Sequence, residues 1–477
     1  MLDNLTAARE QMALSLSFHI IFAVFGMGLP IAILYAEYRW IRTSDPVWYA
    51  LARKWAKAFG VLFAIGAVSG TVLSFEFGLL WPTFMERYGG VFGLAFTTEA
   101  FAFFLEAIFL GLYLYGWDKL RPWAHWWAGV PLPIAGIASA SFVTTANAWM
   151  NTPVGFVEVN GVVVSAEPLA PFLAPATPHQ VVHMVVAALM CVGFGLAAVY
   201  AVGLLRGRRD AYHRRGLAVG LAIGAVFAPV QILIGDWATR AVADQQPAKL
   251  AAIEGLATTG PDAPLSLGGV WDGEQLRGAL ELPGVLSWLL HGRTDAVITG
   301  LDVVPLTDRP PVTVTHLAFD VMVGIGTALL GLAAWTAWRW WRARRGHYPD
   351  GWTGSIWYLR AVALAGPAPV IALIAGWIVT EVGRQPWIVH LRLRTTDAVS
   401  DQPGLYWYLY ATIGIYALLS VSLIAILRRL TRQPMARPPG SSAVADAPAE
   451  SDPAVSGPPA DGPAETSSTV SGPEVVR

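Results

Sequence analysis

Residues 12–37 read MALSLSFHIIFAVFGMGLPIAILYAE, an apolar stretch with its one charged residue, Glu37, at the end. Such a run is long enough to cross a hydrocarbon layer of about 30 Å as an α-helix. It follows Arg9-Glu10 directly and contains no small-residue cleavage site. We therefore expect a retained membrane helix here, with a signal peptide as the alternative.

Similar apolar runs recur along most of the chain. Of its 477 residues, 55% are hydrophobic and only 14% are charged, whereas about 25% of the residues of a soluble domain are charged. The pattern predicts an all-α integral membrane protein with about nine transmembrane helices in a bundle. The candidate spans are 12–37, 57–81, 92–116, 126–149, 181–205, 216–239, 317–341, 357–381 and 406–429.

The connections between these spans alternate in their content of Lys and Arg. Basic residues gather around 39–57, 119–121, 206–215, 339–360 and 428–437, whereas the connection 150–180 has none. Because basic loops stay in the cytoplasm, this asymmetry predicts the N-terminus outside and the C-terminus cytoplasmic.

Two segments are too polar to lie in the membrane. The pattern divides the chain into helices 1–6 (1–239), an extracytoplasmic loop (240–316), helices 7–9 (317–432) and a C-terminal segment (433–477). The last is rich in Pro, Ser, Ala and Gly, which predicts a disordered cytoplasmic tail. The net charge of −1 argues against nucleic acid as a partner. The single Cys191 allows no disulfide framework and is expected to be a buried hydrophobe.

Four potential iron ligands fall in the predicted outer half of the membrane: His19, His183, Met322 and Glu381. Imidazole and thioether are haem ligands, and a His/Met pair gives a low-spin haem with a raised potential. Each residue also has an ordinary interpretation. A membrane histidine can bond a neighbouring carbonyl, and a methionine usually packs.

Further polar residues at membrane depth are functional candidates because burying them there is costly. Glu99 and Glu106 lie seven residues apart, on one helix face and about 10 Å apart along the axis. We expect them to be neutral or to pass protons, with partnered structural acids as the alternative. Glu76 and Asp236 are weaker candidates near predicted helix ends.

The segment 381–387 (EVGRQPW) joins an acid to a base. Glu381 and Arg384 share a helix face at i, i+3, and Pro386 is expected to end the helix. An arginine at the membrane surface suits a haem propionate or another carboxylate. Arg9 lies on the same predicted side and is a second candidate, with contact to lipid headgroups as its alternative.

Seven segments together resemble one known family. In family order they are 11–30 around His19, 99–106 (EAFAFFLE), 147–155 (NAWMNTPVG), 179–183 (HQVVH), 249–254 (KLAAIE), 318–324 (AFDVMVG) and 383–387 (GRQPW). They resemble subunit I of cytochrome bd-type quinol oxidases, and the last is the most specific. The resemblance covers the chain to about residue 430, and the short connection after Glu254 is similar to the family's short quinol-loop branch.

The resemblance implies three haems. His183 and Met322 would be the axial ligands of a low-spin haem b that takes electrons from quinol. His19 and Glu381 would bind the other two, a high-spin haem b and haem d, in either assignment. Arg384 and Arg9 would contact cofactor carboxylates.

The resemblance also implies roles for four residues in proton transfer. Glu99 and Glu106 would deliver protons beside the high-spin haems. Lys249 and Glu254 would bind quinol, and the carboxylate would act as base while the hydroxyl oxidises.

The implied function is oxidation of menaquinol or ubiquinol at the outer face, coupled to reduction of O2 to water with protons from the cytoplasm. The enzyme would lie in the bacterial cell membrane with a second membrane subunit (subunit II), and a small single-span subunit is a further candidate partner. Two alternatives remain open. One is a b-haem-only cyanide-insensitive quinol oxidase or quinol dehydrogenase, and the other is an ion transporter, against which the lack of internal repeats argues.

One residue departs from the family pattern. Asp320 stands where Arg or Gln is expected. An acid two residues before a methionine ligand would favour the oxidised haem and lower its potential, unless that acid is protonated or paired. We therefore expect Asp320→Arg to raise the potential of the low-spin haem, and an unchanged redox titration would contradict this.

Overall fold

The structure is a computed structural model that describes residues 3–348 and 351–438. Within these ranges, nine helical segments are long and apolar enough to span a membrane, as the sequence predicts. Seven are single helices: α1 (Asn4–Thr43), α2 (Pro46–Leu80), α3 (Pro82–Gly116), α6 (Thr177–Leu205), α7 (Ala211–Gln245), α10 (Val312–Arg344) and α14 (Leu405–Arg432).

The other two segments are interrupted by proline. The fourth consists of α4 (Pro122–Gly129) and α5 (Pro131–Asn151), and the eighth of α11 (Ile356–Leu364) and α12 (Ala368–Val382). Proline has no N–H and interrupts the hydrogen-bond ladder of a helix. The eighth segment ends at Val382, so the expectation that Pro386 ends it was wrong by four residues.

Most helices extend beyond the predicted spans. The first begins at Asn4 rather than at residue 12, because the Asp3 side chain caps it by accepting from the Thr6 N–H at 2.8 Å. Hydropathy marks the apolar part of a helix, whereas caps mark its ends.

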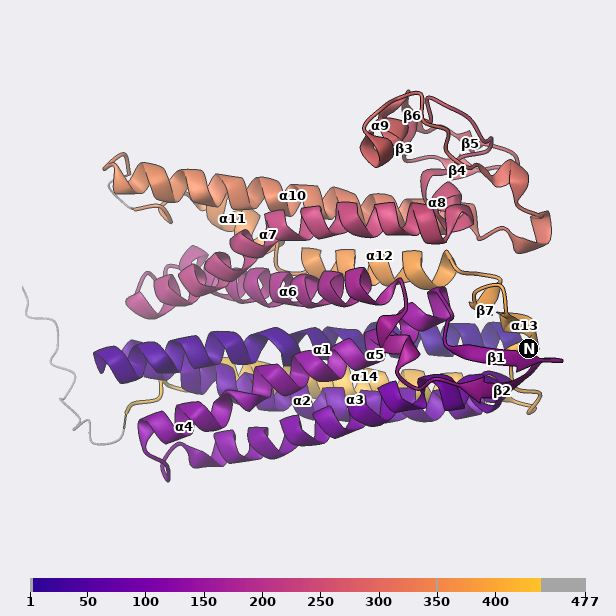
Figure 1. The fold of residues 1–477 in the computed structure, drawn as a ribbon. Helices are drawn as coiled ribbons and strands as arrows, with labels where there is room; N and C mark the ends of the chain where they lie inside the picture. Colours follow the sequence, from indigo (N-terminus) through magenta and orange to yellow (C-terminus); the bar gives the residue numbers. More distant parts are fainter. Residues whose placement is uncertain (1–2, 349–350, 439–477) are drawn as a thin grey trace, which may run out of the picture. The chain divides into compact units, whose positions relative to one another are not determined.

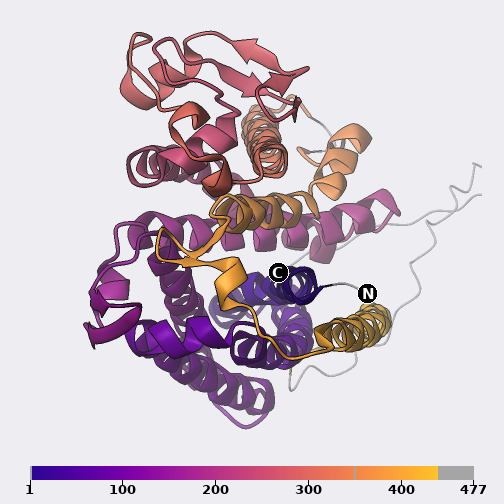
Figure 2. The ribbon, with the colours of Figure 1, turned by 90° about the vertical axis from the view of Figure 1, so that its right-hand side faces the viewer.

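The helices form two groups (Figures 1 and 2). In the first, α1 packs along α2, α3 packs along α5, and α14 lies against α1 and α2. In the second, α6 packs along α7, and α10 packs against both α7 and α12. Contacts of α6 with α1 and α5 join the groups. Cys191 of α6 is fully buried at this junction, as predicted.

The closest approach in the bundle is between α6 and α7. A Cβ added to Gly193 would lie 2.3 Å from the Gly224 nitrogen, and one added to Gly220 would lie 2.5 Å from the Ala197 nitrogen. Only small residues let two membrane helices approach so closely. The helix that carries His183 is therefore held tightly against α7.

The segment between α7 and α10 is ordered. It contains α8 (Pro247–Glu254), the antiparallel pairs β3 (Leu265–Leu267) with β6 (Leu280–Leu282) and β4 (Val270–Trp271) with β5 (Leu276–Arg277), and α9 (Val285–His291). Two single turns, η2 (Leu301–Val303) and η3 (Leu306–Asp308), follow. A small core around Leu250, Leu286 and Ile298 holds it together. The predicted loop 240–316 is thus shorter, because 240–245 belong to α7 and 312–316 to α10.

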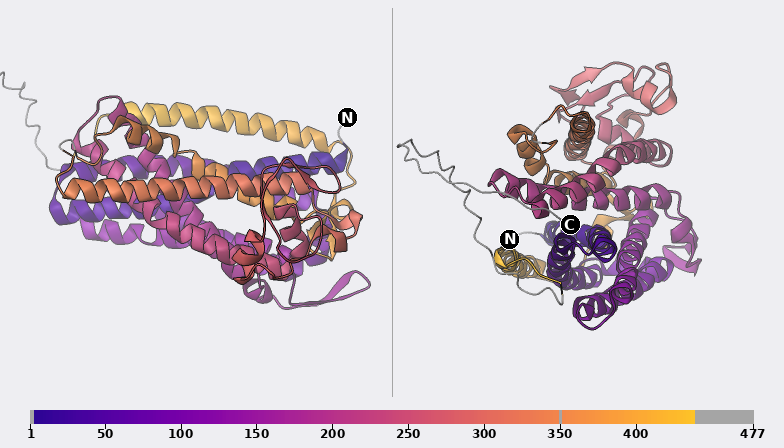
Figure 3. Two further views of the ribbon diagram at one scale, coloured as in Figure 1. Left: turned by 90° about the horizontal axis from the view of Figure 1, so that it is seen from above. Right: turned by 90° about the vertical axis from the view of Figure 1, so that its left-hand side faces the viewer.

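This segment lies at the end of the bundle where α1 begins, called the N-terminal end below (Figures 1 and 3). Two hairpins lie at the same end. The first pairs β1 (Phe156–Val159) with β2 (Val162–Ala166), and η1 (Ala170–Leu173) follows it. The second pairs β7 (Trp387–Val389) with β8 (Leu393–Arg394), followed by α13 (Thr395–Ala398).

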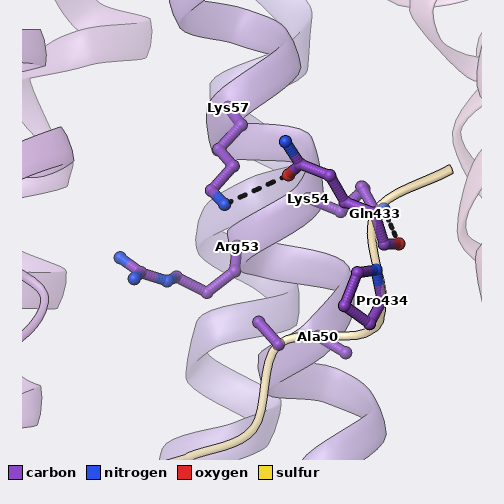
Figure 4. A pocket seen from close by; sticks show the side chains of 7 residues that line it. Ala50, Arg53, Lys54, Lys57, Gln433 and Pro434 are labelled. Carbon is purple, nitrogen blue, oxygen red and sulfur yellow. Dashed lines mark hydrogen bonds between the residues drawn. The ribbon is translucent and has the colours of Figure 1, made fainter. Parts of the chain in front are cut away.

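At the opposite end, a small crevice lies between α2 and the residues that follow α14 (Figure 4). Lys54 donates to the carbonyl oxygens of Leu430 at 2.8 Å and Gln433 at 3.0 Å. This lysine binds carbonyls at the end of α14, where the Leu430 carbonyl also accepts the Gln433 N–H at 3.2 Å, so the crevice is structural. The predicted tail 433–477 lies largely outside the described residues.

Candidate functional site

Five polar side chains form one hydrogen-bonded chain at the N-terminal end, here called the Lys249–Arg384 chain. Lys249 of α8 donates to Asn151 Oδ1 of α5. Asn151 Nδ2 donates to Asn147 Oδ1 at 3.1 Å, and Asn147 Nδ2 donates to Glu381 Oε1 of α12. Arg384 completes the chain by donating to Glu381 Oε2 at 2.6 Å. The predicted quinol-binding lysine and the predicted iron ligand are therefore connected through two asparagines.

Local sequence explains this arrangement. Asn147 and Asn151 lie at i, i+4 in the last turns of α5 and share one face. Gly383 lets α8 approach the end of α12, because a Cβ there would lie 3.1 Å from Lys249 Cγ. Arg9 also reaches this region, since its Nη2 donates to Gln385 Oε1 at 2.9 Å. The predicted pairing of Glu381 with Arg384 is confirmed.

Burial shifts the pKa values of ionisable side chains that lie outside the membrane spans. It holds the pKa of Lys249 well below its ordinary value, the charge of Arg384 adds to this effect, and Glu381 opposes it. Burial also lowers the pKa of Arg384. His390 follows β7, and burial, then Lys249 and Arg384, lower its pKa to about 4. Burial thus disfavours the charged form of the Lys249 amine.

Glu254 points in another direction from Lys249. The two residues lie five positions apart on α8, and Glu254 is only 2% exposed. Burial, followed by the nearby Asp320 of α10, raises the pKa of Glu254 to about 8. The structure therefore places Lys249 beside α5 and α12, and Glu254 beside α10.

Asp320, the departure from the family pattern, is paired. Its Oδ2 accepts the Gly268 N–H at 2.6 Å and lies 3.4 Å from His316 Nε2. The expected lowering of a haem potential depended on an unpaired acid. With these partners, the expected effect of Asp320→Arg on the potential becomes smaller.

His19 is held against α2. Its Nδ1 lies 3.0 Å from Ser69 Oγ, and that hydroxyl donates to the Gly66 carbonyl at 3.1 Å. Because the hydroxyl proton is used, Ser69 accepts from Nδ1–H, which leaves the Nε2 lone pair for a metal. A Cβ at Gly70 would lie 2.9 Å from the ring. His19 lies about 22 Å along α1 from the first residue of the helix, Asn4.

His183 and Met322 lie in the second helix group. Gln231 Nε2 of α7 donates to His183 Nε2 at 3.1 Å, and His183 Nδ1 is buried without a partner among the described residues. Met322 of α10 faces α12, where a Cβ at Gly376 would lie 2.9 Å from its Sδ. Glycine thus keeps space open beside the sulfur.

The two acids of α3 face α5 and α1, which form a seam with α3. Ser139 donates to Glu99 Oε1 at 3.1 Å. Glu106 is 5% exposed, and its Oε1 would lie 3.2 Å from a Cβ at Gly136 and 3.6 Å from one at Gly26. This oxygen has no hydrogen-bond partner within the described ranges. The prediction that both acids share one face agrees with these contacts.

The weaker candidates have structural partners. Glu76 accepts from Ser15 at 2.6 Å and from Gln11 at 3.0 Å. Asp236 pairs with Arg240 at 2.8 Å, and both side chains are about half exposed. The second pair is an ordinary surface ion pair.

Sequence reasoning missed a buried cluster farther along the seam. Glu37 is fully buried, accepts from Tyr113 Oη at 2.5 Å, and lies 2.6 Å from His125 Nδ1. His125 Nε2 donates to the Tyr113 carbonyl at 2.8 Å. Tyr113 follows Glu106 by seven residues and therefore lies on the same face of the helix. The spacing that identified Glu99 and Glu106 could also have identified Tyr113.

Several side chains at these sites suit haem. The buried guanidinium of Arg384 has Nε and Nη1 without partners among the residues the structure describes. These N–H groups can donate hydrogen bonds to a propionate carboxylate. His19 presents the Nε2 lone pair, and glycines stand beside His19 and Met322. The Nε2 lone pair of His183 accepts from Gln231 in this structure. Buried polar groups are normally satisfied, so these unpaired atoms fit a bound cofactor with carboxylates and an open metal.

Comparisons with known proteins agree with this geometry. The family model for cytochrome bd terminal oxidase subunit I matches residues 7–435. The putative cytochrome bd menaquinol oxidase subunit I of Bacillus subtilis is 35% identical over 440 residues, covering 89% of this chain and 96% of that protein. The cytochrome bd-II ubiquinol oxidase subunit 1 of Escherichia coli is 27% identical over 498 residues, covering 91% and 97%.

A solved structure gives the same result for the fold. The bd oxidase from Geobacillus thermodenitrificans matches with a TM-score of 0.84 and 37% identity, covering 90% of this chain and 98% of that one. The bundle and its sites define a multi-pass, haem-binding membrane protein of electron transport. The chain belongs to the cytochrome bd terminal oxidase subunit I family.

Proposed function

We propose that this chain is the quinol-oxidising, haem-carrying subunit of a bd-type terminal oxidase in the bacterial cell membrane. The observation that carries the proposal is the Lys249–Arg384 chain, which connects a buried amine on α8 to the acid and base of the segment 381–387. Family membership supports quinol and O2 as the substrates.

Three haems complete the proposal. His183 and Met322 would hold a low-spin haem b, while His19 and Glu381 would hold a high-spin haem b and haem d. Arg384, with two unpaired nitrogens, and Arg9 would bind propionates. When bound, the haems supply one-electron transfer and reduction of O2 at an open iron position.

Quinol oxidation needs groups that hold the hydroxyls and take their protons. Lys249 would hydrogen-bond one quinone oxygen, and Glu254 would accept a proton. The raised pKa of Glu254 makes its carboxylate a stronger base once it is ionised, and burial, which lowers the pKa of Lys249, disfavours a charge beside a neutral quinone oxygen. Because α8 lies at the N-terminal end, and the basic connections lie at the other, these protons would leave outside.

Protons for water would come from the cytoplasm by way of the α3 acids. Glu106 and Glu99 lie on one face, and a neutral carboxyl in a membrane passes protons at little cost in charge. Delivery from the cytoplasm and release outside make the reaction electrogenic.

The partners follow from the relatives. One Bacillus subtilis relative is named a menaquinol oxidase and the Escherichia coli relative a ubiquinol oxidase, so either quinol is a candidate. We expect a second membrane subunit (subunit II), and a small single-span subunit as a further candidate partner.

The test is a reduced-minus-oxidised visible spectrum of the oxidase purified with its second subunit, on the wild type and on His183→Ala. We expect a haem b band and a far-red haem d band, with the low-spin component lost in the variant. Haem b without the far-red band would make the protein a b-haem-only quinol oxidase or dehydrogenase. A colourless protein would overturn the proposal and favour an ion transporter.

A further inference from the structure

We propose that His316, whose two ring nitrogens each contact a backbone carbonyl oxygen, is a positioning residue that fixes the quinol-oxidising end of α8. The inference rests on the proposed function, because it assigns a role to a residue beside Glu254. His316 was not a candidate from the sequence. It lies near the start of α10 and is fully buried.

Both ring nitrogens of His316 face carbonyl oxygens. Nδ1 lies 2.6 Å from the Ile253 carbonyl oxygen, and Nε2 lies 2.9 Å from the Gly268 carbonyl oxygen. A backbone carbonyl accepts hydrogen bonds and has no proton to donate. A neutral histidine has a single N–H, so it would leave one of these contacts without a proton. Both bonds exist together only when the ring carries two protons and a positive charge.

The counter-charge lies one helical turn away. Asp320 Oδ2 is 3.4 Å from His316 Nε2 and also accepts the Gly268 N–H at 2.6 Å. Gly268 is therefore held through both its N–H and its carbonyl. From α8, the groups that face this pair are Glu254, which is coupled to Asp320, and the Ile253 carbonyl. A buried cation needs such a partner.

His316 acts on α8 through its contact with the carbonyl oxygen of Ile253. This residue precedes Glu254 in the last turn of α8, where carbonyls lack partners within the helix. A cation there is also favourable for the helix dipole. His316 thus joins the end of α8, the β3–β4 connection and α10, and it fixes the direction in which Glu254 points.

The experiment uses the oxidase purified with its second subunit and compares His316→Phe with the wild type. The rate of O2 consumption is measured against the concentration of ubiquinol-1 and, separately, menadiol. We expect kcat/KM for quinol to fall roughly tenfold, because Glu254, the proposed proton acceptor, is no longer held in position, while the haem bands stay unchanged. His291→Phe is the control, because His291 is an exposed histidine of the same segment.

A second variant keeps the test decisive if His316→Phe does not assemble. His316→Gln retains one donor, so its kcat/KM should lie between those of the wild type and His316→Phe. An unchanged kcat/KM in a correctly coloured variant would overturn the inference, and so would a rise of kcat/KM from pH 7 to pH 9 identical to that of the wild type. Failure of the proposed function is distinguishable, since the wild type itself would then lack quinol oxidase activity or haem bands.

Discussion

Burial shifts the pKa values of Lys249 and Glu254, the two proposed quinol-binding residues of α8, in opposite directions. It raises the pKa of Glu254 to about 8 and holds the pKa of Lys249 well below its ordinary value. In each case the low dielectric disfavours the charged form. Burial therefore disfavours a charge on either side chain, and Glu254, with a pKa of about 8, is largely protonated at pH 7.

The pKa of Glu254 predicts a pH dependence. A carboxyl accepts a proton only when it is ionised, and the ionised fraction rises through about pH 8. We therefore expect kcat/KM for quinol to increase from pH 7 to pH 9, and Glu254→Gln to lose this increase together with most activity. The measurement is a pH profile of O2 consumption. Glu281→Gln, an exposed acid in the same segment, should keep the profile of the wild type.

At the scale of elements, glycines decide how close helices come to the ligand candidates. Gly376 of α12 leaves room for the Met322 sulfur, and Gly70 of α2 leaves room for the His19 ring. A Cβ added to either glycine would lie 2.9 Å from the side chain of Met322 or His19. A larger residue must therefore displace the ligand or the helix that carries it.

This spacing predicts the effect of Gly376→Leu. The new side chain would push the Met322 sulfur aside, so we expect loss of the low-spin haem b band and a large fall in quinol oxidation, with the protein still assembled. The check is the reduced-minus-oxidised spectrum. Gly331→Leu on α10 is the matched control, since a Cβ there meets nothing within 4 Å. Equal spectra of the two variants would contradict the prediction.

The cluster of Glu37, Tyr113 and His125 joins α1, α3 and α4 at the end of the bundle opposite α8. Removing one partner of a buried pair costs about 3–5 kcal/mol because the other is left unsatisfied. We expect Glu37→Leu and His125→Leu each to lower the thermal midpoint in detergent by several degrees. The double variant should lose less than the sum of the two. Glu10→Leu, an exposed acid of α1, is the control, and additive losses would show that the two residues do not interact.

At the scale of the whole molecule, hydropathy was sufficient to predict the nine spans, because each contains about 20 apolar residues in sequence. The Glu381–Arg384 pair was also predictable, since its residues are three positions apart. The ordered loop was not, because its strands pair residues such as Leu265 and Leu282 across intervening turns. The hydrogen bond from Lys249 to Asn151 joins positions 98 residues apart, and no local pattern records it.

The partners of His316 escaped prediction for another reason. They are the backbone carbonyls of Ile253 and Gly268, and every residue has a carbonyl whatever its side chain. The helix ends were misplaced because capping by a side chain such as Asp3 extends a helix past its apolar part.

Cofactor removal tests the whole bundle. Buried atoms of Arg384, Glu106 and His183 lack partners within the described part of the chain, so the protein without haem would leave them unsatisfied. We expect oxidase prepared from cells that cannot make haem to have a lower thermal midpoint than the haem-loaded form. Adding haem should restore it. Identical midpoints with and without haem would contradict the prediction.

The contact of α14 with α1 and α2 has a consequence for synthesis. About 360 residues separate the end of α1 from the start of α14, and at bacterial translation speeds they take about 20–70 s to make. During that time Gln11 has no Thr412 to bond, and Phe18 has no Tyr416 to stack on. Until α14 has been made, α1 and α2 therefore lie in the bilayer with one side facing lipid. When α14 is inserted, it packs on the part of the chain that was made first.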